Sequence, residues 1–224
     1  MKRKKYISYD QSIIALLAEY GFRKKNKDFF IRDISLDVSQ EISFGHSTQG
    51  QAHAKYYAIR IAILLPKVLE LAQKQNIFMP LTAFYTCNIG ELMPKRQYLE
   101  WFVSEDTDEK YDKKVVESML FHIKKYAIPF LDKYSTPMTI VNGIKSRAYP
   151  NRYGDNYQAC IALFLYGEKE DFEWFVEQRS YEIQFNEYET EGHWDYKHTK
   201  EPIKRGCREF LECANKLSLL LKEK

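Results

Sequence analysis

DQSIIALLAEYGFRKKNKDFFIRDISLDVSQEISF, at residues 10–44, is the stretch that decides the fold. Its first part has apolar residues at helical spacing, with Asp10 as the N-cap and Gly21 suited to end the helix in the left-handed conformation. After a basic turn, residues 35–45 alternate between apolar and polar side chains, which predicts an antiparallel strand buried on one side. The chain therefore opens with an amphipathic helix followed by a sheet.

The alternation recurs at residues 54–64, and Pro66 is suited to open a short helix that ends near residue 75. Residues 81–89 and 97–103 are two further strand candidates. From residue 106 the apolar spacing becomes helical, with Thr107 or Ser104 as the expected cap and Pro129 expected to end or kink the helix.

The last part of the chain is predicted to be mainly helical. Residues 157–166 and 168–181 form an expected helical hairpin that turns at Gly167, and residues 199–221 form an amphipathic helix. The polar, aromatic stretch 184–198 is expected to be a loop or a mobile strand. The predicted class is α+β, with an N-terminal helix on an antiparallel sheet of four to six strands and a helical C-terminal half. We expect one domain over 1–224, with a sheet half at 1–104 and a helical half at 105–224.

Composition excludes several classes of protein. The 224 residues are 45% hydrophobic and 15% aromatic, which is enough for a core, and the net charge of +3 favours neither a nucleic acid nor a membrane surface as partner. No window has the eighteen or so apolar residues of a spanning helix, so we expect no membrane segment. The four cysteines form no Cys-x-x-Cys pair, which favours reduced thiols and a cytoplasmic location.

The order of an N-terminal helix, Gly21-Phe22-Arg23-Lys24-Lys25, an Asn/Lys turn and a strand that begins Phe29-Phe30 resembles the opening of an uncharacterised bacterial domain family. Residues 128–132 and 162–169 are similar to the second half of that family. The resemblance implies a toxin-immunity or interaction module, and it carries no catalytic residues. Immunity proteins against nucleases tend to be acidic, and this chain departs from them in being mildly basic.

Two surfaces are candidates for binding. Arg23, Lys24 and Lys25 could hold phosphates, although a basic turn is usually only solvated. Tyr188, Trp194 and Tyr196 lie among polar residues, and such aromatics suit a protein-binding surface because they bury a large area while keeping a polar tip. Covering the helical half as a lid is the alternative role for these three aromatic residues.

The sequence gives weaker support for a catalytic site or a metal site. Residues 189–198 hold several carboxylates and two histidines, without the spacing of a known metal motif: Glu189, Glu191, His193, Asp195 and His198. His46 with Ser43 or Ser47 could form a nucleophilic pair, but the sequence has no Gly-x-Ser-x-Gly elbow.

We therefore predict a cytoplasmic bacterial protein-binding module without catalysis, cofactor or metal, of the immunity type. A small hydrolase or metal-dependent enzyme is the alternative. Nucleic-acid binding through the basic turn is the second alternative.

Overall fold

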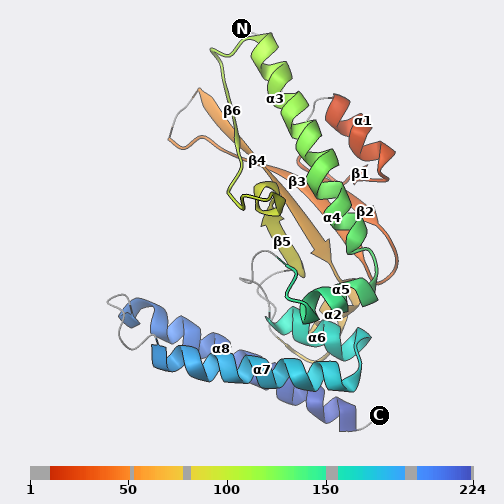
Figure 1. Cartoon of the computed structure of the whole chain (residues 1–224), viewed down its shortest axis with the longest axis vertical. Coiled ribbons are helices and arrows are strands. Elements are labelled where there is room, and N and C mark those ends of the chain that lie inside the picture. The colour runs from red at the N-terminus through yellow and green to blue at the C-terminus, as the bar shows by residue number, and fades with distance from the viewer. Residues whose placement is uncertain (1–10, 51–52, 78–81, 150–155, 190–195, 223–224) are drawn as a thin grey trace. The chain divides into compact units, whose positions relative to one another are not determined.

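The structure is a computed structural model that describes residues 11–50, 53–77, 82–149, 156–189 and 196–222. The chain divides into two compact units that interleave along the sequence. One unit comprises residues 1–64, 85–136 and 149–152, and the other comprises residues 65–84, 137–148 and 153–224. The predicted α+β class is confirmed, with an N-terminal helix, an antiparallel sheet and a helical C-terminal half (Figure 1). The expectation of a single domain stays a prediction.

The first unit contains a six-stranded antiparallel sheet built around one long strand. The strands are β1 (Arg23–Lys24), β2 (Phe29–Asp33), β3 (Ser39–Ser47), β4 (Ala54–Leu64), β5 (Tyr85–Asn88) and β6 (Trp101–Ser104). β4 pairs with β3 along one edge. Its other edge is shared, because its first residues pair with β6 and its last residues pair with β5.

β3 starts later than the sequence alternation predicts. The strand was expected from residue 35, but it begins at Ser39, and Leu36 is 84% exposed. The Ser35 hydroxyl accepts hydrogen bonds from the backbone N–H groups of Asp37 and Val38. A serine side chain that bonds the following backbone in this way favours a turn over a strand. The sheet pairing therefore begins only after this turn.

The sheet unit also contains α1 (Gln11–Glu19), which buries Ile13, Leu16 and Leu17 as the apolar spacing predicts. Asp10, the predicted cap of this helix, lies outside the described residues. α3 (Glu109–His122), the π-helical turn η3 (Ile123–Ala127) and α4 (Ile128–Lys133) follow one another without a break (Figure 1).

The expected cap of this long helix is wrong, and one of the two effects expected of Pro129 is absent. Asp108 is its N-cap and accepts a hydrogen bond from Tyr111 N at 2.6 Å, whereas Thr107 is engaged with Ser104 O and the Asp112 side chain. Pro129 does not end the helix, and the alternative, a kink at this proline, stays a prediction. The π turn directly before α4 changes the backbone bonding ahead of the proline, which has no N–H to donate.

The second unit is helical. It contains α2 (Pro66–Lys74), α5 (Pro137–Lys145), α6 (Asn156–Tyr166), α7 (Lys169–Glu189) and α8 (Tyr196–Lys222). Five consecutive residues of α6, Cys160 to Phe164, are buried, and α6 contacts the other four helices. A helix that is apolar all round is suited to this central position.

The predicted helical hairpin is present as α6 and α7. The loop or mobile strand expected at 184–198 is wrong for residues 184–189 and 196–198, and residues 190–195 lie outside the described residues. α7 continues through Glu189, and α8 already begins at Tyr196. Figure 1 shows these two helices alongside each other within the second unit, where they are in contact. Among the described residues, no helix is long and apolar enough to cross a bilayer.

Candidate protein-binding surface

α7 has a buried side and an exposed side. Phe172 is buried and meets the Phe164 ring of α6 edge-on, with ring centroids 5.9 Å apart. Phe175 packs against Phe210 of α8 at 6.3 Å. Two residues along a helix turn through about 200°, so Trp174 lies on the side opposite to Phe172. Contacts with α6 and α8 therefore leave the Trp174 side of the helix facing solvent.

Large aromatic groups occupy this outer side. Trp174 is 37% exposed and Tyr181 is 65% exposed. They are seven residues apart, which places them on the same face, two turns from each other. Tyr188, predicted to bind a partner, continues the interval of seven residues along α7.

Carboxylates alternate with these aromatic residues. Glu170 and Glu177 are exposed, and each is three or four residues from Trp174, so they share its face of the helix. We call Glu170, Trp174, Glu177 and Tyr181 the acid–aromatic stripe. Asp171, in contrast, points to α5, where Lys145 Nζ lies 2.5 Å from its Oδ1 and holds the pKa of Asp171 below its ordinary value.

Of the three aromatic residues predicted to bind, the structure describes the backbone of two. The backbone of Tyr188 lies in the last turn of α7, and Tyr196 is the first residue of α8. Trp194 lies outside the described residues, as do Glu191, His193 and Asp195 of the metal candidate. In the described part of the chain, no group of three or more metal-ligating side chains comes together.

The three basic residues predicted to bind lie in or next to β1, in the first unit, and are exposed. Arg23 Nη2 lies 2.7 Å from Asp33 Oδ2, so an acid compensates its charge. Burial raises the pKa of Glu41 above its ordinary value, and the positive charge of the nearby Lys25 partly offsets this rise. Carboxylates therefore accompany Arg23 and Lys25, two of the three cations, and this reduces the positive potential available to a phosphate.

Replacing Arg23 with Gln should raise the pKa of Asp33. Hydrogen bonds from Arg23 and Ser39 hold the pKa of Asp33 below its ordinary value of 3.8. The Arg23–Asp33 pair therefore stabilises the fold above about pH 3.8, and this stabilisation is lost as the pH falls through the lower pKa that Asp33 has in the folded state. Titration of the Asp33 carboxyl carbon by NMR measures the shift. Lys24→Gln is the matched control and should leave it unchanged. An unchanged Asp33 pKa in Arg23→Gln would show that the ion pair is absent in solution.

The proposed nucleophilic pairs with His46 do not fit a regular strand. His46 lies near the end of β3, with its ring centroid 6.0 Å from that of Tyr57. Ser43 and Ser47 are an odd number of residues away, so the alternation of a strand directs them to the opposite face of the sheet.

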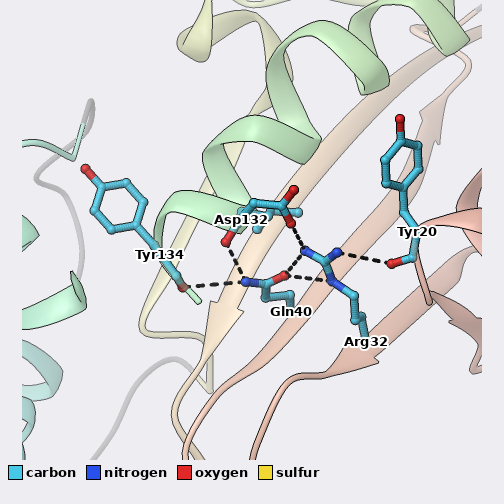
Figure 2. Close-up of polar contacts among 6 residues, drawn as sticks. Tyr20, Arg32, Gln40, Asp132 and Tyr134 are labelled. Atoms are coloured by element: carbon cyan, nitrogen blue, oxygen red, sulfur yellow. Dashed lines mark hydrogen bonds and ion pairs between the residues drawn. The ribbon is translucent and has the colours of Figure 1, made fainter. Parts of the chain in front are cut away.

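The first unit contains a buried polar cluster that the sequence did not predict (Figure 2). Gln40 has no exposed surface, and its side-chain N–H₂ donates to Leu131 O at 2.6 Å. Its Oε1 accepts from Arg32 Nε and Nη2 at 3.0 and 2.5 Å. Arg32 also donates to Tyr20 O at 3.1 Å and pairs with Asp132 at 2.7 Å. The cluster therefore joins the chain just after α1 to β2, β3 and the end of α4.

The cysteines whose side chains the structure describes are free and buried, as expected for reduced thiols: Cys87, Cys160 and Cys213. Burial raises the pKa of Cys87 to about 12, which leaves it protonated at neutral pH. Cys160 and Cys213 bring α6 and α8 together through a hydrogen bond between their side chains. This bond, together with burial, raises the pKa of Cys160.

Comparison with known proteins gives no relative: no family model matches the chain, and neither a curated protein nor a solved structure matches it significantly.

Proposed function

We propose that the chain is a non-catalytic protein-binding module that contacts its partner through the outer face of α7. One observation carries the proposal: Trp174 and Tyr181 expose large aromatic surfaces on one face of a helix whose opposite face is already packed. Trp and Tyr are the residues that most often dominate the energy of protein interfaces. An exposed aromatic face of this kind gains stability when a partner covers it.

The resemblance of residues 21–30 to a bacterial interaction family supports an immunity role as the biological setting of this binding. Reduced, buried thiols support a cytoplasmic location, where disulfides are rare. A toxin encoded by the adjacent gene would be the partner in that setting.

Co-expression of this chain with that gene product should restore the growth of cells that the toxin inhibits. The double variant Trp174→Ala/Tyr181→Ala should abolish this rescue.

The double variant Trp174→Ala/Tyr181→Ala should weaken partner binding by about 30-fold or more, since each side chain has the size and chemistry of an interface hot spot. The partner is retained from cells by the tagged chain, identified by mass spectrometry, purified, and titrated by calorimetry. Phe121→Ala is the matched control, because Phe121 is 52% exposed on α3 in the other unit. If the double variant binds the purified partner as tightly as the control, the α7 surface is not the interface.

A further inference from the structure

The acid–aromatic stripe also indicates the chemistry of what it binds. Acids in the first turn of a helix are explained by the helix dipole, and this accounts for Glu170 and Asp171. It does not account for Glu177, which lies more than two turns into α7. Glu177 is exposed and lies between the two exposed aromatic residues, three positions after Trp174 and four before Tyr181.

A carboxylate between two aromatic rings suits one kind of side chain. An arginine guanidinium can stack on the face of Trp or Tyr while its N–H groups bond a carboxylate, and both contacts strengthen when the partner excludes water. Glu170 provides a second carboxylate one turn before Trp174. The stripe therefore repeats the pattern of carboxylate followed by aromatic ring twice along the helix.

The same charges exclude other occupants of this face. Residues 169–189 contain seven Asp or Glu and two Lys or Arg, so phosphates and anionic lipids are repelled. A second copy of α7 would bring like charges together, which disfavours self-pairing. α8 contains seven Lys or Arg and three Asp or Glu, and its attraction to α7 supports their pairing within the unit. That pairing leaves Glu177 on the exposed side.

We propose that the acid–aromatic stripe binds an arginine-bearing apolar segment of the partner protein, with arginine side chains placed on Trp174 and Tyr181 and bonded to Glu177. The inference rests on the proposed function and adds the chemistry of the partner. It predicts that binding weakens with salt, because part of the affinity comes from exposed charges.

The test uses three fluorescent helical peptides with the same leucine spacing and with Arg, Lys or Glu at the flanking positions, titrated by anisotropy. The Arg peptide should bind the intact chain most tightly, and the Glu peptide should not bind. Glu177→Gln should weaken binding of the Arg peptide about fivefold and make it less sensitive to salt. Glu70→Gln is the matched control, since Glu70 is an exposed acid of α2 in the same unit.

Equal binding of the Arg and Glu peptides, no binding of the Arg peptide, or an unchanged affinity in Glu177→Gln would overturn the inference. The purified partner separates this failure from that of the proposed function. If Trp174→Ala/Tyr181→Ala loses the partner while Glu177→Gln and salt have no effect, the binding surface stands and its arginine chemistry is wrong. If the double variant keeps the partner, the proposed function itself fails.

Discussion

Replacing Gly90 with Ala should destabilise the sheet unit by about 3 kcal/mol, since forcing extra volume into a packed site costs roughly 1–3 kcal/mol and neighbouring hydrogen bonds are lost as well. Gly90 lies in the short turn η2 (Ile89–Leu92). A methyl group on it would collide with Gln97 O and would lie 2.7 Å from Leu99 Cβ and 2.9 Å from Leu99 N. Two of these atoms belong to the backbone, so a side-chain rotation cannot relieve the clash.

The segment against Gly90 is held in place by Asn88. Its side chain accepts from Leu99 N at 2.8 Å and donates to Leu99 O at 2.9 Å, while its Oδ1 also caps the turn by accepting from Gly90 N. A methyl group at position 90 must push Leu99 away and break this pair of bonds. The displacement would reach β6, which begins two residues later at Trp101.

Urea unfolding followed by tryptophan fluorescence measures the effect. Changing Trp174 and Trp194 to Phe leaves Trp101 as the single reporter, and Trp101 belongs to the sheet unit. Gly45→Ala is the matched control: its new methyl group would lie 3.9 Å from Ala58 O, an ordinary contact, and stability should change by less than about 0.5 kcal/mol. Equal stability of the two variants would mean that residues 97–99 do not pack on Gly90.

Local patterns in the sequence predicted most of the sheet unit. β4 has the predicted bounds, and its alternation buries Tyr57, Ile59 and Ile61 as expected. Pro66 opens α2 at the first helical position because it needs no hydrogen-bond donor there. The error at residues 35–38 arose because the alternation continues through a turn that a serine hydroxyl stabilises.

The α7 surface was only half predictable. The sequence predicts a helix at 168–181, which contains Trp174 and Tyr181. The aromatic residues predicted to bind were instead Tyr188, Trp194 and Tyr196, in or beside a stretch expected to be a loop or a mobile strand. The recurrence of aromatic residues at 174, 181 and 188 was the available signal for a helix with a second, outward face. Their exposure could not be predicted, because it depends on the packing of Phe172 and Phe175 against residues from other helices.

The sequence signals that Gln40 is a buried polar residue, but it does not identify the hydrogen-bond partners of Gln40. Gln40 occupies an inward position of β3 between the buried residues Val38 and Ile42, and a polar residue at such a position needs hydrogen-bond partners. Nothing local identifies those partners. One of them, Leu131 O, is 91 residues away, at the end of a helix whose position depends on the whole unit.

Replacing Gln40 with Leu should destabilise the sheet unit by about 3 kcal/mol, because a buried polar group left without its partner costs roughly 1–3 kcal/mol and more when it is charged. The variant removes the donor to Leu131 O and the acceptor of two bonds from Arg32. The Arg32 side chain is only 13% exposed, so water replaces these bonds poorly. Gln73→Leu, at an exposed position of α2, should change stability by less than about 0.5 kcal/mol.

A double-mutant cycle with Arg32→Met separates the polar cluster from simple packing. If the two side chains depend on each other, the double variant Arg32→Met/Gln40→Leu should be more stable than the sum of the single effects predicts, by at least about 1 kcal/mol. Removing both polar groups is less costly than leaving one of them buried alone. Gln40→Glu adds a further test, since its carboxylate can pair with Arg32 but cannot donate to Leu131 O. It should therefore lower stability while keeping its coupling to Arg32, whereas additive effects in the cycle would show that the cluster does not act as a unit.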